Sequence, residues 1–136
     1  MAKIRHIAIR SEDPEKTAKF FVEGFGLTLV QRRAHGPIDL SDGDVNITVL
    51  PASLGAGQEV RLGFDHIGFS VEDDEATRSK LTGLGAEELR PLQLGDVFYE
   101  SKYKSPEGLT VDVGHWAGTS PLPSTEATPA GAAAQD

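Results

Sequence analysis

The chain has 136 residues, with 13 Lys and Arg against 21 Asp and Glu, and a formal net charge of −8. This length fits one domain with a single hydrophobic core. The acidic balance disfavours nucleic acid as a partner, because a phosphate backbone is bound by surplus Lys and Arg. The sequence contains no Cys, so any bound metal would have nitrogen and oxygen ligands.

No apolar run approaches the roughly 20 residues that a membrane-spanning helix needs. The N-terminus, MAKIRHIAIR, lacks the apolar segment and the small-residue cleavage site of a secretory signal. We therefore expect no membrane partner and a cytoplasmic location. The basic cluster Gln31-Arg32-Arg33 is too short to reverse the charge argument, and we interpret it as a solvated strand end.

The first predicted elements are a strand and a helix. Residues 3–10 alternate apolar positions with period two, which predicts a half-buried strand. Asp13-Pro14-Glu15 then predicts the start of a helix, which we expect to end at Gly24 and Gly26. The strand candidates that follow are residues 27–30, 38–40 and 45–50.

After a connector of residues 52–62, the same order returns. The predictions are a strand at 64–71, a helix from residue 72 to about 84, and strands at 87–89, 97–104 and 109–115. This is an internal repeat of about 60 residues. The sequence thus predicts an α+β fold in which two βαβββ units, residues 3–51 and 63–116, form one curved mixed sheet. We expect residues 1–116 to form a single domain and the Ala-, Pro- and Thr-rich residues 117–136 to form a flexible tail.

A histidine occupies the same place in the first strand of each unit, His6 in IRHIAIRS and His66 in FDHIGFSV. Each shares a strand face with a small residue two positions on, Ala8 or Gly68. We interpret the small residues as space for a ligand beside two imidazoles that approach a pseudo-two-fold axis. The alternative is that each histidine is a core residue with a satisfied hydrogen bond.

The last predicted strand supplies a carboxylate. Its apolar Leu109, Val111 and Val113 point one way, so Asp112 points the other way and must be paired, ligated or exposed. Neutral imidazole is the commonest metal ligand in proteins, and two of them with a carboxylate form a usual divalent site. The matching residue of the first unit is Thr48, a poor ligand. We therefore predict three ligands, His6, His66 and Asp112, with an exposed edge-strand acid as the alternative for Asp112.

Three stretches of the sequence resemble a known superfamily. They are HIAIRSEDPEKTAKFFVEGFGLTLV, FDHIGFSVEDDEATRSKLTGLGAEE and KYKSPEGLTVDVGHW, and they fall in order over residues 3–116. They are similar to the glyoxalase / bleomycin-resistance / extradiol-dioxygenase proteins, the vicinal oxygen chelate superfamily. That fold hosts lyases, isomerases, ring-cleaving dioxygenases, antibiotic-modifying transferases and metal-free drug binders.

The resemblance implies metal positions at His6, Thr48, His66 and Asp112. Thr48 replaces the first-unit Glu, Gln or His of glyoxalase I and related epimerases, which disfavours a four-ligand glyoxalase I site. Asp112 stands where Glu is usual and is one methylene shorter. The remaining two histidines and one carboxylate are similar to the set in extradiol dioxygenases and in fosfomycin-modifying enzymes. In Fe(II) enzymes such a set leaves positions for a bidentate substrate and for dioxygen.

Proton transfer would need a further group, and the candidates in the second unit are Tyr99, Glu100 and Tyr103. Tyr99 and Tyr103 share parity on their strand, so an orientation that brings both inward turns Glu100 outward. The alternative for each tyrosine is a half-buried side chain with a solvated hydroxyl, and for Glu100 an exposed acid. Lys102 and Lys104 are candidates to neutralise an anionic substrate, or simply face water.

Two classes of function follow. The first is a metalloenzyme that chelates a small substrate through vicinal oxygens, closer to extradiol-dioxygenase chemistry than to a lyase or isomerase of the same fold. Its metal would be Fe2+ or Mn2+, with Zn2+ or Ni2+ as alternatives. The second is a metal-free drug- or metabolite-binding protein, disfavoured because such binders line their groove with aromatic residues and this chain is only 7% aromatic. By resemblance, we expect a homodimer.

Overall fold

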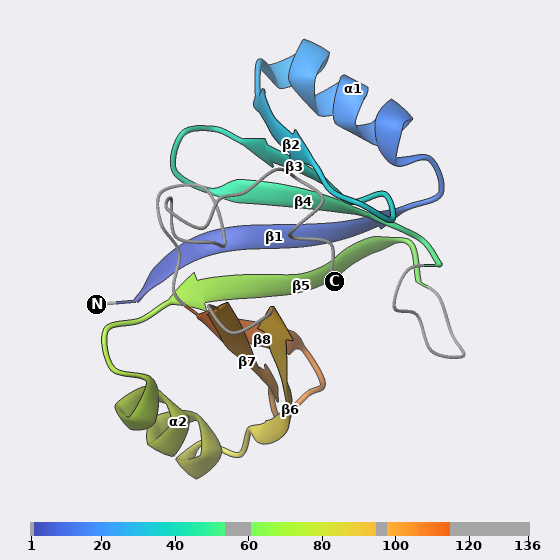
Figure 1. Ribbon diagram of the computed structural model, residues 1–136. Coiled ribbons are helices and arrows are strands. Elements are labelled where there is room, and N and C mark those ends of the chain that lie inside the picture. The colour runs from blue at the N-terminus through green and yellow to red at the C-terminus, as the bar shows by residue number, and fades with distance from the viewer. Residues whose placement is uncertain (1, 54–60, 95–97, 115–136) are drawn as a thin grey trace.

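The computed structural model describes residues 2–53, 61–94 and 98–114, except for the side chains of residues 90–99. Within these residues the helices and strands follow in the order β1 (Lys3–Ser11), α1 (Pro14–Phe25), β2 (Thr28–Arg32), β3 (Ile38–Ser41), β4 (Asn46–Pro51), β5 (Gly63–Ser70), α2 (Asp74–Gly83), β6 (Glu87–Leu94), β7 (Phe98–Lys104) and β8 (Thr110–Gly114) (Figure 1). Each half has the predicted order of one strand, one helix and three strands.

The two halves join through their first strands. β1 and β5 are antiparallel neighbours at the centre of the sheet, with Ile7 opposite Ile67. The strand order is β2-β3-β4-β1-β5-β8-β7-β6, and β4 and β8 each run parallel to the first strand of their own half. The predicted α+β fold, two βαβββ units in one curved mixed sheet, is therefore confirmed (Figure 1).

Helix α1 begins and ends on local signals. The Asp13 side chain accepts a hydrogen bond from the backbone N–H of Lys16 at 3.1 Å and caps the first turn. The helix does not end at Gly24, as the sequence suggests, but continues to Phe25. A glycine inside a helix costs only about 1 kcal/mol, whereas Gly26, at φ 75°, adopts the left-handed conformation that ends it.

The packed core lies between α1 and one face of the sheet. Its buried residues are Ala18, Ile38, Leu40 and Val49. Side chains alternate along a strand, so Asp39 of β3 and Thr48 of β4, which are cross-strand partners, point to the opposite face. That opposite face carries the candidate site. Helix α2, by contrast, contributes no buried residue.

Some predictions concern residues outside the described part of the chain. The predicted tail, residues 117–136, lies there, as do residues 54–60 of the predicted connector. The division into a domain of residues 1–116 and a tail stays a prediction. Among the residues that the structure describes, no helix has both the length and the apolar composition to cross a membrane.

Candidate metal site

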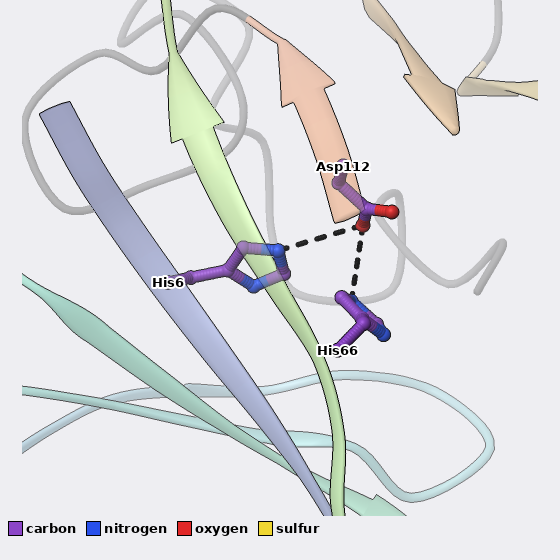
Figure 2. Close-up of side chains that lie close together, drawn as sticks. All are labelled: His6, His66 and Asp112. Carbon is purple, nitrogen blue, oxygen red and sulfur yellow. Dashed lines mark ion pairs between the residues drawn. The ribbon is translucent and has the colours of Figure 1, made fainter. Parts of the chain in front are cut away.

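Three adjacent strands bring His6, His66 and Asp112 together. His6 lies on β1, His66 on β5 and Asp112 on β8, and Gly68 of β5 is the cross-strand partner of both His6 and Asp112. Cross-strand partners point to the same face of a sheet, so all three side chains lie on the face opposite α1. Figure 2 shows both imidazole rings beside the carboxylate.

The distances fit a divalent ion. Oδ2 of Asp112 lies 3.0 Å from Nε2 of His66 and 3.6 Å from Nε2 of His6, and one atom of each residue lies within 4.8 Å of the others. Ligand atoms about 2.1 Å from one ion are about 3 Å apart, so small side-chain movements suffice. Oδ2 is also buried and faces the Nε2 atoms of both histidines, as expected for an atom that could bind a metal.

Gly68 makes room for the ring of His6. A Cβ atom at Gly68 would lie 2.1 Å from Cδ2 of His6. The interpretation that this small residue leaves space for a ligand beside His66 is therefore corrected, because the imidazole of the other strand occupies that space. Ala8 is likewise the cross-strand partner of His66. Cross-strand partners are closer to each other than residues two apart on one strand. The space above a small residue is therefore filled by the side chain of its partner on the neighbouring strand.

His66 is also held from its other nitrogen. Nδ1 of His66 lies 2.6 Å from Oδ2 of Asp65, and Nε of Arg10 donates a hydrogen bond to Oδ1 of Asp65 at 2.9 Å. Asp65 is the extra residue of a bulge in the β1–β5 pairing. A carboxylate on one ring nitrogen fixes the tautomer in which the other nitrogen can bind a metal.

Burial and hydrogen bonds between neighbouring side chains shift the pKa values of all three site residues. Burial alone would lower the pKa of His66, but hydrogen bonds with Asp112 and Asp65 outweigh it and raise that pKa to about 9. Burial lowers the pKa of His6. Burial alone would raise the pKa of Asp112, but hydrogen bonds from both histidines hold it below its ordinary value. A divalent ion would therefore displace the proton of His66.

Two charged residues of β7 lie on the same face. Lys102 is the strand partner of Asp112, and its Nζ donates a hydrogen bond to Oδ1 of Asp112 at 2.9 Å. Oε1 of Glu100 lies 3.8 Å from that Nζ, and Glu100 is buried. Its burial, followed by the negative charge of Asp112, raises the pKa of Glu100 to about 7. This carboxyl group can exchange a proton near neutral pH.

The orientation of β7 differs from the one that brings both tyrosines inward. Glu100 faces the site, whereas Tyr103 pairs with Val111 on the opposite face. There burial, and then the charge of Glu88, raise the pKa of Tyr103. The side chain of Tyr99 lies outside the described part of the chain. In the segment FYESKYK, Glu100 and Lys102 alternate with Ser101 and Tyr103, and the pairing of Lys102 with Asp112 puts the charged set on the site face.

Thr48 holds the place in the first half that Asp112 holds in the second. It is the partner of Ala8, as Asp112 is of Gly68. The Thr48 hydroxyl lies 2.8 Å from Oδ1 of Asp39 and 2.7 Å from Oδ1 of Asn46, and its single proton can be donated to either of these acceptors. The hydroxyl of Thr48 therefore bonds neighbouring side chains of the sheet.

Asp39 is saturated by neighbouring donors. Nη2 of Arg33 donates to Oδ1 at 3.1 Å, Nε of Arg33 lies 3.1 Å from Oδ2, and Nε2 of Gln31 donates to Oδ2 at 2.7 Å. The expectation that Arg33 is a solvated strand end is wrong, since its side chain is 5% exposed. Arg32 is exposed as expected and pairs with Glu15.

Sequence reasoning missed Asp65 and Arg10. The signal was present, because an acid directly before His66 in an apolar strand must find a partner. Arg10 follows the apolar run of the other central strand and carries the matching charge. Only the pairing of β1 with β5 brings the two residues together.

Comparison with known proteins identifies the fold family. The sequence profile described as the Glyoxalase/Bleomycin resistance protein/Dioxygenase superfamily matches residues 3–113. No curated protein sequence matches the chain significantly.

Solved structures share the fold at low identity. A hypothetical protein, BH1468, from Bacillus halodurans C-125 superposes with a TM-score of 0.70 at 18% identity, over 85% of this chain and 95% of that one. The 2,3-dioxygenase LapB from Pseudomonas sp. KL28 gives 0.66 at 16% identity, over 87% of this chain and only 42% of its own. A methylmalonyl-CoA epimerase variant from Streptomyces coelicolor, in complex with 2-nitronate-propionyl-CoA, gives 0.62 at 18% identity, over 85% and 98%. These likenesses show the fold alone.

Proposed function

The chain belongs to the Glyoxalase/Bleomycin resistance protein/Dioxygenase superfamily, and we propose that it is a metal-dependent enzyme acting on a small molecule with two adjacent oxygen atoms. The observation that carries this proposal is the convergence of His6, His66 and Asp112 from three strands. Each histidine would bind the ion through Nε2 and Asp112 through Oδ2. Three protein ligands leave further coordination positions for substrate.

A bound divalent metal would act as a Lewis acid that stabilises negative charge on the two substrate oxygens. Residues of the chain keep the ligands in place. Asp65 orients His66 through Nδ1, and Gly68 admits the ring of His6. A site for a chelating substrate needs this support, because a misplaced ligand lowers the affinity of the site for the metal.

Within this class we favour ring-cleaving chemistry like that of extradiol dioxygenases. Two histidines and one carboxylate leave room for a bidentate substrate and a second small ligand, and this set is typical of non-haem Fe(II) oxygenases. Thr48, at the fourth position, carries a neutral hydroxyl that bonds neighbouring side chains and is a poor ligand, which supports a three-ligand site. We propose Fe2+ or Mn2+ as the metal, with Zn2+ or Ni2+ as alternatives.

Proton transfer, as in a lyase or isomerase, is the second candidate, and Glu100 favours it. This carboxyl group is buried on the site face, its pKa is raised to about 7, and Lys102 lies beside it. In this role Glu100 would take a proton from the carbon next to a chelated oxygen and return it. Methylmalonyl-CoA epimerases are among the proteins with a similar fold.

Metal content of the purified protein tests the proposal. We expect one equivalent of Fe2+, Mn2+, Zn2+ or Ni2+ in the wild type and none in His66→Ala, because the variant lacks a central ligand. His35→Ala is the matched control, since His35 is exposed in the β2–β3 turn and should leave metal content unchanged. A wild type that binds none of the four ions would favour a metal-free drug- or metabolite-binding protein.

Oxygen consumption then separates the two chemistries. With a panel of catechols, the metal-loaded protein should consume dioxygen if it cleaves rings. No uptake with any catechol, together with exchange of a substrate C–H proton that Glu100→Gln abolishes, would favour the lyase or isomerase. We also propose a cytoplasmic location and a homodimer. Sedimentation of the purified chain would test the homodimer.

A further inference from the structure

The geometry points to Lys102 as a specificity-determining residue that selects substrates bound as dianions, such as a vicinal diol or catechol with both oxygens deprotonated. This inference rests on the proposed metal site and deepens it. It names the charge state of the substrate and a residue of this chain that sets it.

The position of Lys102 is unusual for a strand lysine. Its side chain is only 24% exposed, and its Nζ donates to Oδ1 of Asp112 at 2.9 Å. Oδ2 of the same carboxylate faces the two histidines. One carboxylate thus stands between an ammonium group and the place where a metal would bind.

The charge count of the site follows from these contacts. Two neutral imidazoles and one carboxylate would leave a divalent ion with a net charge of +1. Here Lys102 offsets the charge of Asp112, and Arg10 offsets that of Asp65 at 2.9 Å. Before Glu100 is counted, the bound ion would therefore act with nearly its full +2; an ionised Glu100 lowers that charge by one, and Lys102 adds the same single positive charge in either case. A ligand with two negative charges neutralises such a site, whereas one with a single charge leaves an excess.

Among the described residues, Glu100 is a further charged group beside Lys102. Its carboxylate is farther from Nζ than that of Asp112, 3.8 Å against 2.9 Å, so Asp112 is the closer counter-charge. Glu100 weakens the excess positive charge when it is ionised. Replacing Glu100 by Gln should therefore strengthen dianion binding, opposite to the effect of removing the charge of Lys102.

A purely structural role for Lys102 makes a different prediction. If the lysine only orients Asp112, its loss would weaken the metal site and then affect every substrate-like ligand equally. If Lys102 instead sets the net charge of the site, its loss leaves the negative charge of Asp112 to be balanced by the metal alone. Metal affinity is then kept or increased, and only the preference for doubly charged ligands falls.

The test uses the full chain loaded with Zn2+ and two bidentate oxygen ligands. 4-Nitrocatechol binds as a dianion and tropolone as a monoanion, with a similar bite. Dissociation constants are measured by absorbance and calorimetry for the wild type, Lys102→Met and Lys102→Arg. Lys104→Met is the matched control, because it removes the same charge at an exposed position of β7.

We expect Lys102→Met to lose about tenfold in preference for 4-nitrocatechol over tropolone, the size expected for one unit charge at short range. Lys102→Arg and Lys104→Met should keep the preference, and Glu100→Gln should increase it. Equal changes for both ligands, or none, would overturn the inference while leaving the metal site intact. Zn2+ affinity is measured first, by competition with a chromophoric chelator. A wild type that does not bind Zn2+ would overturn both proposals.

Discussion

The two halves of the molecule share the same order of one strand, one helix and three strands. They differ in how the acidic residue on the polar face of each half is bonded. In residues 3–51 the acid Asp39 is saturated by Arg33, Gln31 and Thr48, and α1 covers a buried apolar core. In residues 63–114 the acid Asp112 has a lysine on one oxygen and two histidines near the other, and α2 buries no residue.

This difference shows how a duplicated unit can divide stability and chemistry. A carboxylate whose acceptor positions are all filled is a structural element. A carboxylate with one buried oxygen aimed at two imidazoles is available to a cation. Natural sites are commonly less optimised for stability than the scaffold that holds them; here the first half holds the packed core and also contributes His6 to the site.

Replacing the two acids should give the largest contrast. Asp39→Ala leaves the buried guanidinium of Arg33 without its carboxylate, so we expect the free energy of unfolding to fall by about 3–5 kcal/mol. Asp112→Asn should cost about 1–2 kcal/mol, because Lys102 can turn to water and His66 can lose its proton, but it should abolish metal binding. Urea unfolding and metal analysis of both variants measure this. Equal losses of stability would break the comparison.

Adding one methyl group at Gly68 of the second half should give the next largest effect. Gly68→Ala puts a Cβ atom 2.1 Å from the ring of His6, so we expect metal affinity to fall about a hundredfold, roughly 2.7 kcal/mol. Gly24→Ala is the control, since a Cβ there meets nothing within 4 Å, and an alanine inside α1 should stabilise the fold slightly. Unchanged Zn2+ affinity in Gly68→Ala would show that His6 can move without loss.

The metal-free protein should show a smaller, pH-dependent effect confined to the second half. The folded-state pKa of His66, about 9, exceeds its ordinary value of 6.5, and that of Glu100, about 7, exceeds 4.5. The native state therefore binds more protons than the unfolded chain between these values. Glu100 makes stability fall as pH rises from about 5 to 7, His6, whose pKa is lowered, opposes that fall below pH 6.5, and His66 makes stability fall from about 6.5 to 9.

We expect a total fall of about 1–3 kcal/mol in the free energy of unfolding, measured by denaturation in the presence of a metal chelator. In His66→Gln the part of the fall between pH 6.5 and 9 should disappear, while the part below pH 7 from Glu100 remains. A flat profile in the wild type would mean that neither group keeps its proton in the folded protein.

The sequence by itself determined the repeat, the order of the elements and the identity of the three converging residues. These features depend on alternation within one strand and on turn and capping residues, which are local. Asp112 between two valines, and a histidine in the same place of each first strand, are patterns of that kind. They predict which face a side chain takes without knowledge of its neighbours.

Only the tertiary structure decided which residues face each other across strands. The pairing of β1 with β5 placed Gly68 against His6 and, through a bulge, Asp65 against Arg10. The pairing of β7 with β8 placed Lys102 on Asp112 and turned Tyr103 away. Cross-strand register depends on the whole sheet, since shifting it by one residue exchanges the two faces. The supporting residues of the site therefore could not be read from any single strand.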